Sequence, residues 1–145
     1  MTSSQMFSRM HGGTTHFPIA LVIVSMLFDL IAFAIRREPY TKELHIAAFY
    51  CLMVGALGSF AAVLSGLWIS RWETFGSGML GKHHIFIWPG FALLIGMAGW
   101  RIVVRDKASR RAFALYLAVG IVTAILIAGG GYWGGEMLMA LQMNG

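Results

Sequence analysis

Five histidines stand out in a chain that is otherwise short of polar side chains, and four of them form two pairs. His11 and His16 precede and open the first long apolar stretch, and His83 and His84 open the third. Imidazole is a common ligand for iron, copper and zinc. Cofactor sites in helical bundles are built from side chains on facing helices, and two such histidines hold a b-type haem from both sides. These four residues are therefore the first candidates for a cofactor site.

Two carboxylates extend the set of candidate residues. Asp29 lies inside the first apolar stretch, thirteen residues after His16, which is about 20 Å deeper along a helix. A carboxylate at that depth costs a few kcal/mol, so we expect it to face the bundle interior, with Tyr50 as a hydrogen-bond donor at a similar depth. It would serve a proton relay or a quinone site, or else a buried clamp between helices. Glu136 would orient a ligand histidine or bind a metal, or else be a solvated carboxylate at a helix end.

The elements that must position these residues are membrane helices. The chain is 58% hydrophobic and only 12% charged, whereas a soluble protein has about 25% charged residues. Four apolar stretches reach the length of about 20 residues that a transmembrane helix needs: residues 17–35, 46–69, 84–104 and 112–133. The alternating polarity of β-barrel strands is missing. The sequence therefore predicts one all-α domain over residues 1–145, a bundle of four transmembrane helices.

The lysines and arginines predict how this bundle is oriented. Eight are counted with the loops between the first and second and between the third and fourth stretches, including Arg101 near the end of the third: Arg36, Arg37, Lys42, Arg101, Arg105, Lys107, Arg110 and Arg111. Three fall on the opposite face: Arg9, Arg71 and Lys82. By the positive-inside rule the face with eight is cytoplasmic, so both termini lie on the external, periplasmic side of a bacterial inner membrane. The two histidine pairs then lie at one depth on the external face, and His45 is alone on the cytoplasmic side.

The second apolar stretch carries a seam of small residues, and the chain has a single cysteine. The seam consists of Gly55, Ser59, Ala62 and Gly66, whose spacing puts them on one helical face. Such a seam allows a neighbouring helix to pack closely, or leaves a groove for a flat cofactor. The lone Cys51 excludes a disulfide framework and a cysteine zinc site. The net charge of +5 lies in loops that set orientation, so nucleic acid is not an expected partner.

At these residues the sequence resembles a bacterial membrane-protein family catalogued as domain of unknown function 2231. The resemblance rests on the run HGGTTHFPIA at residues 11–20, on Asp29 at its offset in the first helix, on His83 or His84, and on the closing Gly-Gly-Glu at residues 134–136. The sequence departs from the family in having Gly12 where proline is usual, and its tail after Glu136 matches poorly. The resemblance implies a four-helix inner-membrane protein. It also implies respiratory electron transfer, because members accompany Rieske or cytochrome c modules.

These observations lead to one main prediction and two alternatives. The main prediction is a b-type haem protein, a subunit of a respiratory complex that passes electrons between quinone and an external redox partner. His16 and His84 are the preferred axial pair, and His11 and His83 could instead supply the pair or bind a second haem. The alternatives are an external copper or zinc site of histidines with Glu136, and a cofactor-free structural subunit. Whether the chain is an enzyme in its own right stays open.

Overall fold

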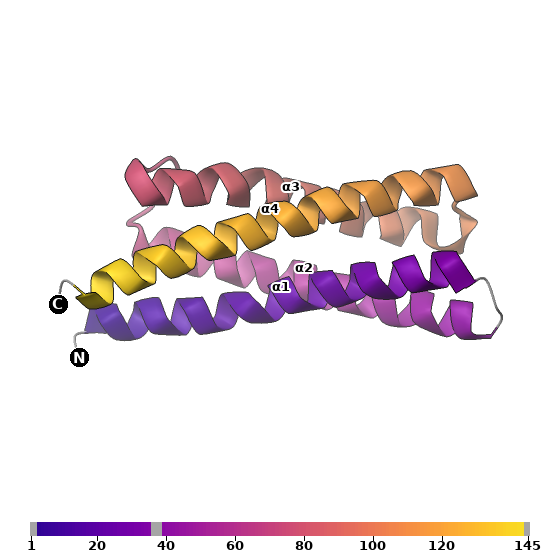
Figure 1. The fold of residues 1–145 in the computed structure, drawn as a ribbon, viewed down its shortest axis with the longest axis horizontal. Coiled ribbons are helices and arrows are strands. Elements are labelled where there is room, and N and C mark those ends of the chain that lie inside the picture. The colour runs from indigo at the N-terminus through magenta and orange to yellow at the C-terminus, as the bar shows by residue number, and fades with distance from the viewer. Residues whose placement is uncertain (1–2, 36–38, 144–145) are drawn as a thin grey trace.

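The computed structural model describes the backbone of residues 3–35 and 39–143, and the side chains from residue 11 onward except those of residues 106, 141 and 142. This part of the chain is helical: α1 (Ser3–Ile35), α2 (Tyr40–Ile69), α3 (Gly78–Val104) and α4 (Arg110–Met143), with a 3-10 turn η1 (Arg105–Lys107) before α4 (Figure 1). Each of the four α-helices is long and apolar enough to cross a membrane. The prediction of an all-α protein with four membrane-spanning helices is confirmed.

Three helices end where their apolar stretches end, α4 continues ten residues beyond its predicted end to Met143, and all four begin earlier than predicted. The ends of α1, α2 and α3 at Ile35, Ile69 and Val104 coincide with the predicted ones. Polar and charged residues continue the same helices beyond the apolar stretches, because a helix remains favourable where it leaves the lipid. At 1.5 Å per residue, α1 is about 50 Å long, against about 30 Å for the hydrocarbon core of a bilayer. His16 therefore lies well inside α1, and His84 lies in the second turn of α3.

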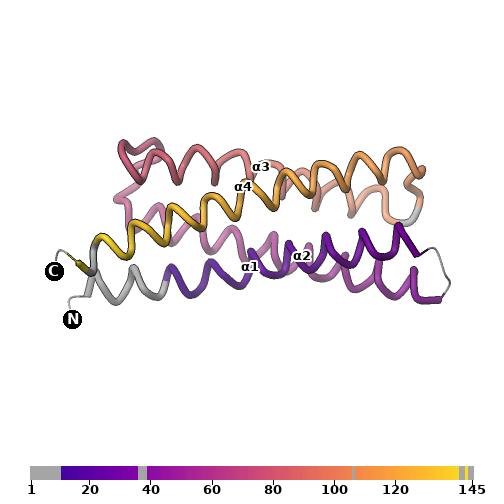
Figure 2. The backbone as a smooth tube through the Cα atoms, in the orientation of Figure 1, coloured from indigo at the N-terminus to yellow at the C-terminus, as the bar shows by residue number. Residues whose placement is uncertain are grey.

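The four helices form two antiparallel hairpins. α1 packs most extensively on α2, and α3 on α4, while α2 and α3 have the fewest contacts of the packed pairs. Helix α4 starts beside the end of α3 and crosses the bundle obliquely, so that its own end lies beside the beginning of α1 in the other hairpin (Figures 1 and 2). We call the end of the bundle where α1 begins and α4 ends the terminal end. The loop between α2 and α3 is also there (Figure 1).

The middle of the bundle is filled by apolar side chains from all four helices. Val22, Met26, Leu52, Leu94 and Met97 are buried there. A glycine makes this packing possible, because a Cβ atom at Gly120 of α4 would overlap the sulfur of Met26. Large apolar side chains on the outer faces of the helices are exposed in the isolated chain. That distribution suits a bundle whose outer surface contacts lipid.

Candidate functional site

A cavity of about 370 Å³ lies between the two hairpins in the terminal half of the bundle. All four helices contribute to its walls, and its lining is mainly apolar. It reaches inward as far as Val22, Leu94 and Ile127 near the middle of the bundle. The four clustered histidines of the sequence, His11, His16, His83 and His84, all line it. The structure thus brings together on one cavity four residues that the sequence separates by up to 73 positions.

Two of these imidazoles are held in the way that metal-binding histidines are usually held. Nδ1 of His11 lies 2.7 Å from the Ser65 hydroxyl, and that hydroxyl donates its own hydrogen to the Ala62 carbonyl at 2.9 Å. With the hydroxyl hydrogen on the Ala62 carbonyl, the Ser65 oxygen accepts from Nδ1 of His11, and this is the tautomer that leaves Nε2 of His11 unprotonated. Nδ1 of His83 donates to the Gly130 carbonyl at 2.8 Å. Both neutral rings then keep Nε2 as the nitrogen with a free lone pair, and their orientation is fixed by the bond at Nδ1.

The other two histidines are placed differently. His84 is buried, and its Nδ1 accepts a hydrogen bond from the backbone N–H of Gly76 at 3.3 Å. The hydrogen of a neutral His84 ring is therefore on Nε2, which leaves that nitrogen a donor. His16 borders the cavity, but the residue is exposed. The geometry favours the pair His11 and His83 over the pair His16 and His84.

The seam of small residues on α2 has two uses in the structure. Gly55 packs against α1, where a Cβ atom would lie 3.1 Å from a side-chain carbon of Val22. Ser59, Ala62 and Gly66 line the cavity. A Cβ atom at Gly66 would lie 3.2 Å from Cε1 of His11, which is closer than an ordinary van der Waals contact. The glycine therefore lets the His11 ring lie directly against the α2 backbone, and both predicted uses of the seam occur, close packing and an open groove.

Glu136 and the metal-site alternative find less support. Gly135 and Met137 line the cavity, but Glu136 between them does not. Among the residues that the structure describes, no three His, Cys, Asp or Glu side chains are close enough together to hold a metal ion. A copper or zinc site of histidines with Glu136 has no preformed ligand set in this part of the chain.

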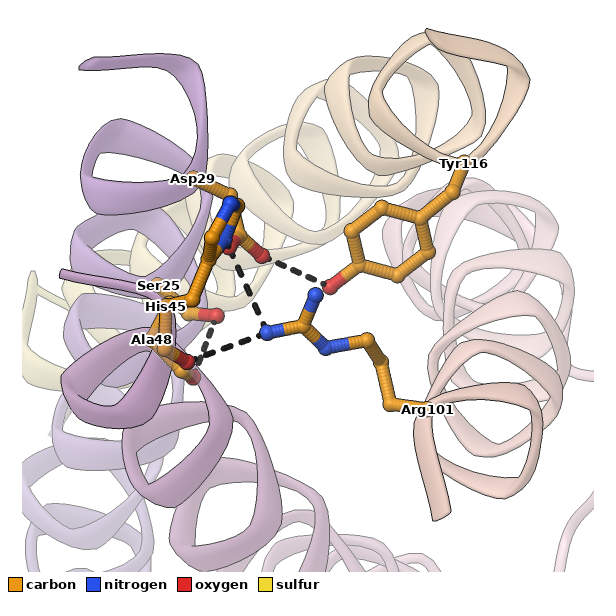
Figure 3. Close-up of polar contacts among 6 residues, drawn as sticks. All are labelled: Ser25, Asp29, His45, Ala48, Arg101 and Tyr116. Atoms are coloured by element: carbon orange, nitrogen blue, oxygen red, sulfur yellow. Dashed lines mark hydrogen bonds and ion pairs between the residues drawn. The ribbon is translucent and has the colours of Figure 1, made fainter. Parts of the chain in front are cut away.

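A second polar cluster lies near the other end of the bundle, around the fully buried Asp29 of α1 (Figure 3). Its Oδ1 atom accepts from Nδ1 of His45 on α2 at 2.7 Å and from Nη2 of Arg101 on α3 at 3.3 Å. Its Oδ2 atom accepts from the Tyr116 hydroxyl on α4 at 3.3 Å. Arg101 also donates to the backbone carbonyl of His45 at 3.1 Å. Four helices thus meet at one carboxylate, and we call Asp29, His45, Arg101 and Tyr116 the Asp29 cluster.

The Asp29 cluster corrects two predictions. Asp29 does face the bundle interior, but Tyr50 is not its donor: Tyr50 is 63% exposed. It follows His45 by five residues, about 140° around the helix, so the two side chains point to different sides of α2. Arg101 belongs to the buried surface of α3 and not to a loop. His45 lies apart from the four histidines of the cavity and bonds to Asp29.

Helical periodicity was the signal that could have found these partners. Arg101 follows the apolar Leu94 by seven residues and Met97 by four, the spacing of one helical face. In the same way, His45 stands three residues before Ala48 and seven before Leu52, which are both fully buried. Charged residues at such positions are predicted to be buried and paired when the face they share is apolar.

No curated protein and no solved structure matches the chain. The model of a family described as "Predicted membrane protein (DUF2231)" matches residues 9–144. The match includes the cavity, its four histidines and the whole Asp29 cluster. The protein therefore belongs to this family of membrane proteins, as the motifs at residues 11–20 and 134–136 indicated.

Proposed function

We propose that the cavity holds a b-type haem between His11 and His83, and that the protein is an electron-transfer subunit of a respiratory complex. One observation carries the proposal: two imidazoles from α1 and α3 line the same cavity, and each is hydrogen-bonded to the protein through Nδ1, so that Nε2 is the nitrogen available as a ligand. His11 and His83 would hold a haem iron, which one or two protein ligands suffice to bind, whereas a bare zinc site needs three or four. The ligand set therefore suits a haem better than a bare metal ion.

The walls of the cavity also suit a flat, largely apolar group. Its lining is mainly apolar, with Val22, Leu94 and Ile127 at the inner end. A haem bound there would supply one-electron redox chemistry at its iron. The protein would set the potential through the two imidazoles, since a hydrogen bond donated by Nδ1–H makes the other ring nitrogen a stronger ligand. The apolar walls would exclude water from the iron.

The charge distribution supports a cavity that opens toward the external side of a bacterial inner membrane. With the buried Arg101 no longer counted as a loop residue, seven lysines and arginines remain at the end with the Asp29 cluster and three at the terminal end. The positive-inside rule then puts the terminal end outside the cytoplasm. A haem there would be close to an external redox partner and, through the lipid, to quinone.

The test is the absorption spectrum of the full-length protein expressed with haem supplied. We expect a reduced-minus-oxidised b-type band that His11→Ala and His83→Ala each abolish, while His16→Ala retains it. Gly66→Leu should also lose the band, because its side chain would collide with the His11 ring.

Three results would contradict the proposal in different ways. A band that survives both His11→Ala and His83→Ala but not His16→Ala would indicate that His16 and His84 are the ligands. Stoichiometric copper or zinc in haem-free protein would favour the metal-site alternative. No band and no metal after full haem supply would leave a cofactor-free structural subunit.

A further inference from the structure

The Asp29 cluster joins the two hairpins. Asp29, His45, Arg101 and Tyr116 make hydrogen bonds and an ion pair from one hairpin to the other. The contacts of His11 with Ser65 and of His83 with the Gly130 carbonyl stay within one hairpin. Ser25 donates to the Ala48 carbonyl within its own hairpin and also interacts with Tyr116 of the other. The polar connection between the hairpins is therefore concentrated near one end of the bundle, and the cavity lies between the hairpins toward the other.

His45 is the most exposed member of the cluster. Its side chain is 28% exposed, whereas that of Asp29 is 0% exposed and that of Arg101 is 6% exposed. Because an ionised Asp29 can only accept, Nδ1 of a neutral His45 carries the hydrogen of their 2.7 Å bond. Nε2 of His45 is then the nitrogen that can take up a further proton.

A proton at His45 would change the charge of the cluster. The negative charge of Asp29 and the positive charge of Arg101 balance each other when His45 is neutral. A protonated His45 adds a positive charge beside Arg101, and both donate to the same Oδ1 atom of Asp29. Like charges repel most strongly where water does not screen them. The contact that weakens is the longer one, from Arg101 to Asp29, which is the ion pair between the hairpins.

We propose that the Asp29 cluster is a proton-binding site, filled from the aqueous side nearest His45, and that a proton on His45 loosens the connection between the two hairpins. The charged and titratable groups that face this site are Asp29 on α1, Arg101 on α3 and Tyr116 on α4, with the exposed Lys42 and Glu43 nearby on α2 itself. This proposal does not depend on what the cavity binds.

Buried side chains separate the Asp29 cluster from the cavity. Between Asp29 and the inner end of the cavity lie the buried side chains of Met26, Met97 and Thr123. The Thr123 hydroxyl donates to the Val119 carbonyl within its own helix, so it does not extend the cluster toward the cavity. In this proposal the cluster exchanges its proton through His45.

The experiment measures distances between spin labels in the purified full-length protein, without added cofactor, as the pH is lowered from about 8 to about 5, the range in which histidine changes charge. Cys51 is first replaced by alanine. One pair of labels joins the hairpins near the cavity, at the exposed positions Phe17 on α1 and Ile85 on α3. The control pair, Ile85 and Tyr132, lies within the second hairpin.

We expect the distance between the hairpins to become longer and more broadly distributed as the pH falls, while the control distance stays constant. In His45→Gln, whose amide can still donate to Asp29 but cannot take up a proton, the shift should disappear. Three outcomes would overturn the proposal: no shift in the wild type, an equal shift in His45→Gln, or a parallel shift in the control pair.

Nitrogen NMR of the histidine rings tests the same proposal in the wild-type sequence, should His45→Gln fail to fold. The His45 Nε2 resonance should titrate with the same midpoint as the distance between the hairpins. A His45 ring that keeps its protonation state while the distance changes would also overturn the proposal.

Discussion

Breaking the ion pair between Asp29 and Arg101 should cost far more than removing it altogether. Arg101→Met leaves a fully buried carboxylate with donors but no balancing charge, and Asp29→Asn leaves a buried guanidinium with the His45 carbonyl as its acceptor. Removing one partner of a buried pair costs about 3–5 kcal/mol, whereas replacing both by uncharged groups is often close to neutral. We therefore expect each single variant to lose about 3–5 kcal/mol of unfolding free energy, and the double variant to lose no more than about 2 kcal/mol.

The assay is equilibrium unfolding in mixed detergent micelles, followed by helical circular dichroism. The double-mutant cycle isolates the interaction, because the two side chains are in direct contact at 3.3 Å. Arg110→Met is the matched control: this arginine lies over the Phe33 ring at 4.5 Å but is exposed, so its loss should cost at most about 1 kcal/mol. Single variants that each cost less than about 1 kcal/mol, or a double variant that costs the sum of the singles, would refute a coupled buried ion pair.

Two further predictions concern packing and orientation. Gly120→Ala should destabilise the protein by about 1–3 kcal/mol in the same unfolding assay, because the new methyl group collides with Met26; Gly96→Ala, which meets no atom within 4 Å, should not, and equal effects at both positions would contradict this account of the core. In a variant without its own cysteine, a membrane-impermeant thiol reagent added to intact cells should label a cysteine at Phe75 in the α2–α3 loop and not one at Lys107 in η1. The reverse labelling pattern would invert the proposed orientation.

The membrane helices were predictable because hydrophobicity is summed over many residues. Twenty consecutive apolar residues leave few alternatives to a spanning helix, and the ends at Ile35, Ile69 and Val104 follow from the charged or polar residues that come next. The starts were less predictable. Residues 40–45 and 78–83 are polar enough to be read as loops, yet they continue helices that extend past the lipid.

The candidate sites, too, were predictable from the sequence only in part. The convergence of the histidine pairs on one cavity follows from helix direction alone, which the sequence supplies. Which nitrogen of each ring is free depends on single contacts, such as those of Ser65 and Gly130, that no spacing rule contains. Depth in the membrane alone did not identify the tyrosine that donates to Asp29. Tyr50 lies at a suitable depth but on a different side of its helix, and the actual donor, Tyr116, belongs to a helix that is distant in sequence.

The position of Asp29 and Arg101 in different hairpins has a consequence for how the chain enters the membrane. Membrane helices are synthesised in order, at about 5–20 residues per second, and Arg101 is 72 residues behind Asp29. Several seconds therefore pass between the synthesis of Asp29 and that of Arg101, its counterion. During that interval the first hairpin can supply a partner of its own, since His45 lies on the very next helix and bonds to Asp29 at 2.7 Å. The arginine, in contrast, finds its acceptor already in place when the third helix is inserted.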